Sequence, residues 1–156
     1  MTVHGTWEGG FRTALGDSTG HSVTVDLPSD EGGENQGPFA LELAVMALAG
    51  CITTIFAIVA KKRRVGFERM EIALDWERPV RSPTIASVDG LLRLVSDAAP
   101  EEAETLLGIT LRTCPVGVLF ERARIPVRVR LELVRSEARP PDAPRDGGAR
   151  AGYGGR

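Results

Sequence analysis

The chain has 156 residues, which is enough for one domain with a substantial core. Its composition, 42 % hydrophobic and 26 % charged, is that of an ordinary soluble globular protein, and a net charge of −2 argues against a general nucleic-acid binder. The first residues hold neither a basic cluster nor an apolar run, so we expect no signal peptide and a cytoplasmic protein. Two cysteines 63 positions apart form neither a disulfide framework nor a metal knuckle, and we interpret the two histidines, His4 and His21, as strand residues rather than metal ligands.

Residues 2–27 are predicted to form three β-strands. Apolar and polar residues alternate along three short segments separated by glycine-rich turns, which is the period-two pattern of half-buried strands. Arg12 lies on the second segment and is expected to point away from Phe11 and Leu15. A solvated strand arginine and a functional cation both fit this position.

The longest apolar stretch of the chain is residues 38–64. Its residues 43–60 carry no charge and are followed by four consecutive basic residues, a combination that meets the criteria for a membrane span. A helix that is apolar all round can instead be buried in the core, and basic residues in its last turn then complement its dipole. Pro38 suits the start of such a helix and Gly66 its end. Because several half-apolar strands need a cover, we favour a core helix that lies beneath all of their faces.

The rest of the chain continues the alternation of strands and helices. After the last predicted strand, the residues are mainly Pro, Gly, Ala and Arg, a composition that predicts disorder, so we divide the chain into a domain (1–135) and a tail (136–156). The element order β-β-β-α-β-β-α-β indicates an α+β fold. The predicted elements after the long helix are strands at 70–76, 84–95 and 127–133 and a helix from 100 that is interrupted at Cys114 and Pro115 and can restart over 116–124.

Three side chains on these elements are candidates for chemistry. Cys51 lies in the middle of the long helix, where it is an inert core residue unless the fold brings a cation to it. Cys114 precedes Pro115 at the N-cap of a helical restart, where backbone N–H groups favour a thiolate, although a plain Cys-Pro kink also fits. Glu42 either complements the dipole of the long helix or holds an arginine near Cys51.

Two motifs in this order resemble those of the OsmC/Ohr family, which includes osmotically inducible protein C and organic hydroperoxide resistance protein. Gly37-Pro38, Leu41-Glu42-Leu43 and Met46-Ala47-Leu48-Ala49-Gly50-Cys51 are similar to the family's ELLLAALAGC segment, and Thr113-Cys114-Pro115-Val116 is similar to its CPV motif. Trp7 to Arg12 and Gly20 to Asp26 are similar to its N-terminal strands. The resemblance covers about residues 2–134.

This resemblance implies an α+β fold in which two chains intertwine as a homodimer, with the long helices buried between sheets. It implies that Cys51 is the peroxidatic cysteine and Cys114 the resolving one, in an enzyme that reduces organic hydroperoxides. Arg12 lies near the position of the family's activating arginine, and Glu42 matches the second acid of its doubled glutamate. Leu41 stands where the family often has the first glutamate, and Ala40 where it often has proline, which indicates a divergent OsmC-like branch.

The implied chemistry needs no metal or bound cofactor. A Cys51 thiolate, with its charge balanced by Arg12, attacks the distal peroxide oxygen and becomes a sulfenic acid, Cys114 condenses with it to a disulfide, and an external dithiol reduces that disulfide. The alternative is a non-peroxidatic OsmC-like dimer, a stress protein that binds a small apolar ligand. Neither hypothesis requires a nucleic acid or a membrane as a partner.

Overall fold

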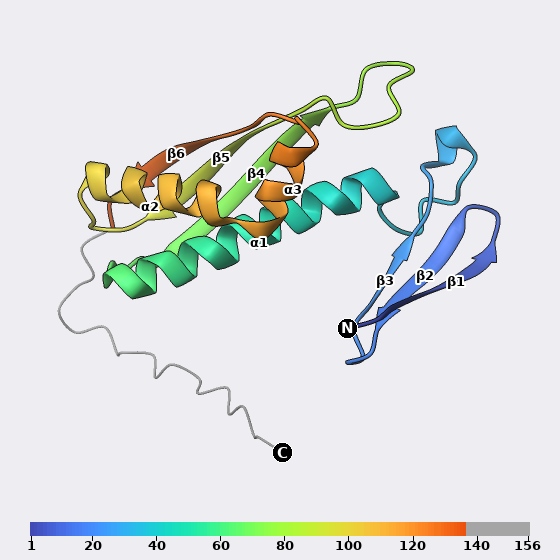
Figure 1. Ribbon diagram of the computed structural model, residues 1–156, viewed down its shortest axis with the longest axis horizontal. Helices are drawn as coiled ribbons and strands as arrows, with labels where there is room; N and C mark the ends of the chain where they lie inside the picture. Colours follow the sequence, from blue (N-terminus) through green and yellow to red (C-terminus); the bar gives the residue numbers. More distant parts are fainter. Residues whose placement is uncertain (137–156) are drawn as a thin grey trace.

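The computed structural model describes residues 1–136, which form two three-stranded sheets and three α-helices (Figure 1). This arrangement confirms the predicted α+β class, with the second helix divided in two. The tail beyond residue 136, including its predicted disorder, lies outside the described residues. The elements are β1 (Val3–Gly9), β2 (Arg12–Asp17), β3 (Ser22–Val25), the 3-10 helix η1 (Ser29–Glu31), α1 (Ala40–Arg63), β4 (Arg69–Glu77), β5 (Ser87–Val95), α2 (Pro100–Thr113), α3 (Pro115–Arg122) and β6 (Val127–Val134).

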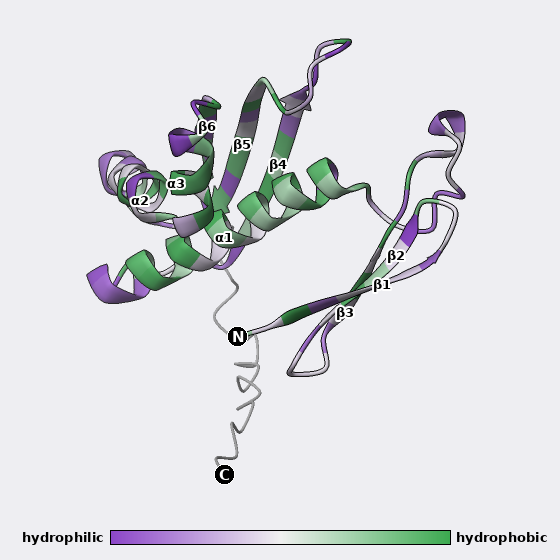
Figure 2. Cartoon of the chain, turned by 45° about the vertical axis from the view of Figure 1, so that its right-hand side comes forward, coloured by the Kyte–Doolittle hydropathy of each residue, from purple (hydrophilic) through white to green (hydrophobic). Residues whose placement is uncertain are grey.

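The first sheet is antiparallel and has the strand order β1-β2-β3. It projects beyond the N-terminal end of α1 and lies apart from the second sheet (Figures 1 and 2). The expectation that the long helix lies beneath all strand faces is therefore wrong within one chain, because the segment between β3 and α1 carries the first sheet away from the helix. The sheet leaves Trp7 and Phe11 70 % and 57 % exposed.

The second sheet has the order β4-β5-β6, with β5 antiparallel to β4 and parallel to β6. The parallel pair requires a crossover, which α2 and α3 provide. Along β4, half-buried and exposed residues alternate, as the sequence pattern predicted. The core lies between this sheet and the helices, and its fully buried side chains include Leu48, Ile52 and Phe56 of α1, Val88, Leu92 and Leu94 of β5, and Leu106 of α2.

Helix α1 forms where the apolar stretch predicts it, with small differences at both ends. It begins at Ala40 rather than Pro38, and it is terminated by Arg64 in the left-handed conformation (φ 60°) rather than by Gly66. Among residues 1–136 it is the one helix that alone is long and apolar enough to cross a membrane. Its buried residues nevertheless recur every three or four positions and belong to the core cluster, as expected for a core helix.

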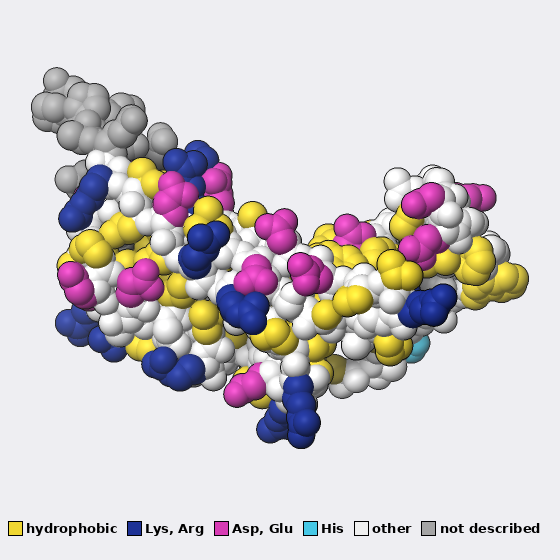
Figure 3. All heavy atoms as spheres, turned by 90° about the horizontal axis from the view of Figure 1, so that it is seen from above, with side chains coloured by type: hydrophobic (Ala, Val, Ile, Leu, Met, Phe, Trp, Pro, Cys, Tyr) yellow, Lys and Arg dark blue, Asp and Glu magenta, His cyan; other side chains and the backbone are white. Residues whose placement is uncertain are grey.

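The face of α1 that points away from this core is also apolar (Figure 2). Met46 and Ile58 on α1 are 53 % and 43 % exposed. Hydrophobic side chains are visible on both the first sheet and the larger body in the space-filling view (Figure 3). The described part of the chain thus exposes apolar surface on its two separated parts.

Candidate functional site

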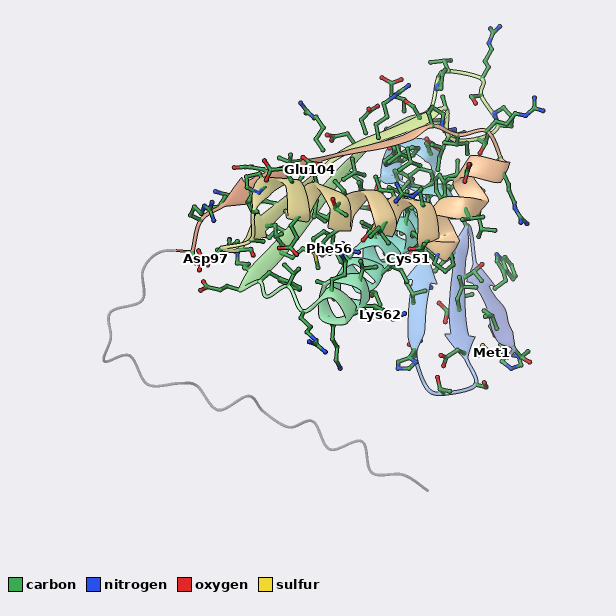
Figure 4. The ribbon with its side chains drawn as sticks, turned by 60° about the vertical axis from the view of Figure 1, so that its left-hand side comes forward. Met1, Cys51, Phe56, Lys62, Asp97 and Glu104 are labelled. Atoms are coloured by element: carbon green, nitrogen blue, oxygen red, sulfur yellow. The ribbon has the colours of Figure 1, made fainter. Side chains whose placement is uncertain are left out.

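The fold brings the two cysteines together. Cys51 is half-buried in the middle of α1, and Cys114 is fully buried between the end of α2 and the start of α3. The two side chains are close enough for Cys51 to help raise the pKa of Cys114. Figure 4 shows Cys51 on α1 near the junction of α2 and α3. Their spacing in the sequence left this meeting open, because it results from the packing of α1 against α2 and α3.

Cys114 caps α3, as its position before Pro115 predicts. Its Sγ accepts a hydrogen bond of 3.3 Å from the backbone N–H of Gly117. Burial nevertheless raises the pKa of the Cys114 thiol from 9.0 to about 11, and the neighbouring Cys51 adds to this effect. The backbone N–H groups at the helix terminus do favour a thiolate at Cys114, as expected, but loss of hydration outweighs them, so the expectation of a net preference for the thiolate is wrong. Cys114 keeps its proton at neutral pH.

Arg12 is held by two carboxylates, neither of which is Glu42. Its guanidinium forms ion pairs with Glu8 at 3.2 Å and with Glu34 at 2.8 Å. Glu42 is exposed in the first turn of α1 and forms no ion pair or side-chain hydrogen bond with another described residue. Within one chain, the structure therefore joins Arg12 to neither Glu42 nor Cys51. No sequence pattern pointed to Glu34, because it belongs to an irregular loop without periodicity.

A buried aspartate, Asp26, organises the loop that carries Glu34. Asp26 is 3 % exposed, and its carboxylate accepts hydrogen bonds from the backbone N–H groups of Leu27 (2.8 Å), Glu34 (3.0 Å) and Gln36 (3.2 Å). Burial opposes the ionisation of Asp26, but the three N–H donors together outweigh it and lower the pKa below its ordinary value. An aspartate that begins a glycine-rich loop is typical of such side-chain capping, so this role could have been predicted.

A pocket of about 600 Å³ lies beside Cys114. This volume is in the range of small-molecule sites. Its walls are mostly apolar, and Arg112, Glu121 and Arg124 contribute charged groups. Cys114 and Gly117 line the pocket, whereas Cys51 does not. The two cysteines therefore have different surroundings: Cys51 is half-buried outside the pocket, and Cys114 lines the pocket.

Comparison with known families identifies the chain. A family model described as OsmC-like protein matches residues 33–130, a segment that contains α1, both cysteines and most of the second sheet. The chain belongs to the OsmC-like family. The predicted family is thus confirmed, and it agrees with a core-helix role for α1. No curated protein matches the chain in sequence.

Solved structures share the fold of this OsmC-like protein at low sequence identity. An OsmC-like protein from Mycoplasma pneumoniae has a TM-score of 0.76 at 12 % identity, covering 85 % of this chain and 96 % of the other. An organic hydroperoxide resistance protein OsmC from Legionella pneumophila has a TM-score of 0.65 at 17 % identity, covering 85 % and 97 %. The organic hydroperoxide resistance protein OhrB of Bacillus subtilis has a TM-score of 0.61 at 18 % identity, covering 85 % and 98 %. At these identities the likeness concerns the fold.

Proposed function

We propose that this OsmC-like protein reduces organic hydroperoxides, with Cys51 as the peroxidatic and Cys114 as the resolving cysteine. The observation that carries this proposal is the contact between a half-buried Cys51 and a buried Cys114 that keeps its proton. Two adjacent thiols rarely ionise together because the charges repel, so a protonated Cys114 suits the resolving role and leaves the nucleophile's role to Cys51 in this proposal. Family membership and the names of two structural relatives, both organic hydroperoxide resistance proteins, support the same chemistry.

The reaction begins at Cys51. Its thiolate attacks the distal oxygen of the hydroperoxide, the O–O bond breaks, and the proximal oxygen takes up a proton and leaves as the alcohol. The Cys51 sulfur is thereby oxidised to a sulfenic acid. Cys114 then gives up its proton and attacks this sulfur, so that water leaves and a disulfide forms. A dithiol from outside the protein reduces the disulfide by two thiol exchanges and completes the cycle.

A homodimer supplies the groups that the single chain does not bring to Cys51. In the proposed dimer, the exposed apolar surfaces of the first sheet and of α1 cover one another, and Arg12 of one protomer balances the charge of the thiolate on its partner. Glu8 and Glu34 hold the guanidinium in place. Glu42, which is exposed on α1, is proposed as a further carboxylate for this arginine once the dimer is assembled. We place the reaction in the cytoplasm, where dithiol reductants are abundant.

Turnover of cumene hydroperoxide with dithiothreitol tests the proposal. We expect Cys51→Ser to abolish turnover, because it removes the nucleophile. Cys114→Ser should still release one equivalent of alcohol and should accumulate a sulfenic acid that dimedone traps on Cys51. Thr53→Ala, a substitution two residues away on the same helix, is the control and should keep turnover. Turnover that survives in Cys51→Ser would refute the assignment.

Binding of a small apolar ligand without peroxide chemistry is the second candidate function. Two observations favour it: Arg12 is already paired with two carboxylates, and the pocket of about 600 Å³ does not include Cys51. If dimedone labels neither wild type nor Cys114→Ser after treatment with peroxide, this candidate replaces the first. An environment-sensitive apolar dye should then bind with saturation, and a substitution that fills the pocket should weaken its binding.

A further inference from the structure

The pocket lies beside Cys114, and Cys51 does not contribute to its walls. Leu48 and Ile52 of α1 form one wall, Ile125 and Val127 contribute another, and Cys114 lies at the junction of α2 and α3. A volume of about 600 Å³ accommodates a chain of several carbon atoms that carries a thiol. The pocket therefore offers an apolar binding site next to one particular sulfur of the pair.

Gly117 lines the pocket next to Cys114 and brings no side chain against its sulfur. A Cβ added at Gly117 would lie 3.5 Å from Cys114 Sγ and 3.3 Å from its Cβ. Cys114 has no solvent-exposed surface, so the pocket wall must yield before a thiolate reaches the sulfur, and a methyl group at Gly117 would pack against that sulfur and hinder the approach. The backbone of Gly117 has no left-handed conformation, so alanine is compatible with it.

The charges around the pocket favour an anionic nucleophile. Arg112 and Arg124 contribute two positive groups against the single carboxylate of Glu121. The species that attacks a disulfide is a thiolate, and a local excess of positive charge raises its concentration at the site. The apolar walls and the positive side chains together suit a thiolate on an apolar chain.

We propose that this pocket binds the reducing thiol and directs its attack to the sulfur of Cys114 rather than that of Cys51. This inference rests on the proposed function, because it assigns the reductant's site within that cycle. The incoming thiolate forms a bond to Cys114 Sγ while the Cys114–Cys51 bond breaks, and Cys51 leaves as a thiolate. The second thiol of the reductant then attacks the sulfur of the first, so that Cys114 is released and takes up a proton, and the reductant becomes a disulfide. Two electrons pass from the dithiol to the protein.

The preferred leaving group agrees with this direction of attack. In thiol exchange, the sulfur with the lower pKa leaves faster. Burial raises the pKa of Cys114 to about 11, which makes it a poor leaving group. Departure of Cys51 also restores the thiolate that the next peroxide needs. The geometry of the pocket and the chemistry of the exchange therefore favour the same product.

Mass mapping of a trapped mixed disulfide tests the inference. The full chain is oxidised with diamide or, separately, with one equivalent of cumene hydroperoxide, is then treated briefly with 6-mercaptohexanoic acid, and is quenched with excess N-ethylmaleimide. We expect mercaptohexanoate on Cys114 and maleimide on Cys51. The reverse pattern, or equal labelling of both, would overturn the inference while leaving the peroxidase proposal intact.

Variants of two helical glycines extend the test to the pocket. Gly117→Ala should slow the exchange about tenfold or more, since small misplacements in a reacting geometry have effects of this size. Gly108→Ala is the matched control on α2, because its Cβ would meet only the end of the Arg112 side chain and Gly108 does not line the pocket. Equal exchange rates in these variants would contradict the pocket route. A disulfide that forms with diamide but not with peroxide refutes the peroxidase alone, and the absence of any disulfide refutes both proposals.

Discussion

At Cys114, two effects act in opposite directions on one thiol. The N–H of Gly117 stabilises a thiolate, as at other helix N-termini, whereas burial in the core stabilises the neutral thiol. Burial wins here because Cys114 has no exposed surface and α3 has only eight residues. In the proposed cycle this balance keeps Cys114 protonated until a sulfenic acid forms beside it.

The raised pKa of Cys114 predicts a loss of stability at alkaline pH. The thiol titrates at about 11 in the folded chain and near 9.0 when unfolded, so its contribution is fully present below pH 9 and is lost as pH rises towards 11. A difference of this size between the folded and unfolded pKa corresponds to about 2 to 3 kcal/mol of unfolding free energy. We expect urea denaturation with reduced thiols to show this loss in wild type between pH 8 and 10.5.

The Cys114→Ser variant provides the comparison for this measurement. A serine at the same N-cap does not titrate in this range, so the free energy of unfolding of the variant should depend less on pH. At neutral pH the variant should be less stable than wild type, because a buried sulfur is replaced. Parallel pH profiles for the two proteins would contradict a raised pKa at Cys114.

Among the elements, the loop between β3 and α1 has the most specific side-chain organisation. Two oxygens of Asp26 accept three backbone N–H groups, and one of these belongs to Glu34, whose carboxylate contacts Arg12. A buried carboxylate thus determines where a loop residue meets a strand residue. The position of the Arg12 guanidinium therefore depends on Asp26 as well as on its direct partners.

Asp26→Asn should loosen this loop. The Oδ2 atom of Asp26 accepts hydrogen bonds from the backbone N–H groups of Glu34 and Gln36. An asparagine whose NH₂ group occupies this position would face two N–H donors and could accept from neither. We expect faster hydrogen exchange of the Glu34 and Gln36 amides at neutral pH. Because the pKa of Asp26 is lowered, its stabilisation is present above about pH 4 and declines below it, so the two proteins should converge in acid.

Asp30→Asn is the matched control for this loop. Asp30 is exposed in η1, so its substitution should leave the exchange of both amides unchanged. If Asp26→Asn and wild type exchange these amides at equal rates at neutral pH, the carboxylate does not organise the loop.

The sequence predicted these elements unequally well. Local patterns were sufficient for α1, for the alternating strands such as β4 and for the cap at Cys114, because each depends on neighbours in the chain. The pairing of Arg12 with Glu34 depends on loop geometry, and the contact between Cys51 and Cys114 depends on helix packing. The pKa of Cys114 could not be predicted from its cap alone, because burial is a property of the whole fold.

At the scale of the whole molecule, the two sheets formed by residues 1–136 do not pack against one another. A small sheet depends on a hydrophobic face or on a helix packed against it for its stability, and this sheet leaves Trp7 and Phe11 largely exposed. On the other part of the chain, α1 leaves Met46 and Ile58 exposed. Each Å² of apolar surface that is removed from water contributes roughly 25 cal/mol of stabilisation. A second copy of the chain can cover both surfaces at once. This complementarity is the physical basis of the proposed homodimer.

Light scattering after size exclusion should therefore give wild type twice the chain mass of 16.7 kDa. We expect Trp7→Glu and Ile58→Asp to weaken dimerisation at least about tenfold, because each places a charge in a surface that the dimer buries. Val80→Glu is the control, since Val80 is 94 % exposed at the β4–β5 turn, outside these surfaces. Peroxide turnover per chain should fall along with the dimer fraction, because Arg12 acts on the partner's Cys51 in the proposed assembly. A monomeric wild type with full turnover would exclude this arrangement. Arg12→Lys within an intact dimer separates loss of the guanidinium from loss of assembly, since lysine keeps the charge but lacks the fork that Glu8 and Glu34 hold.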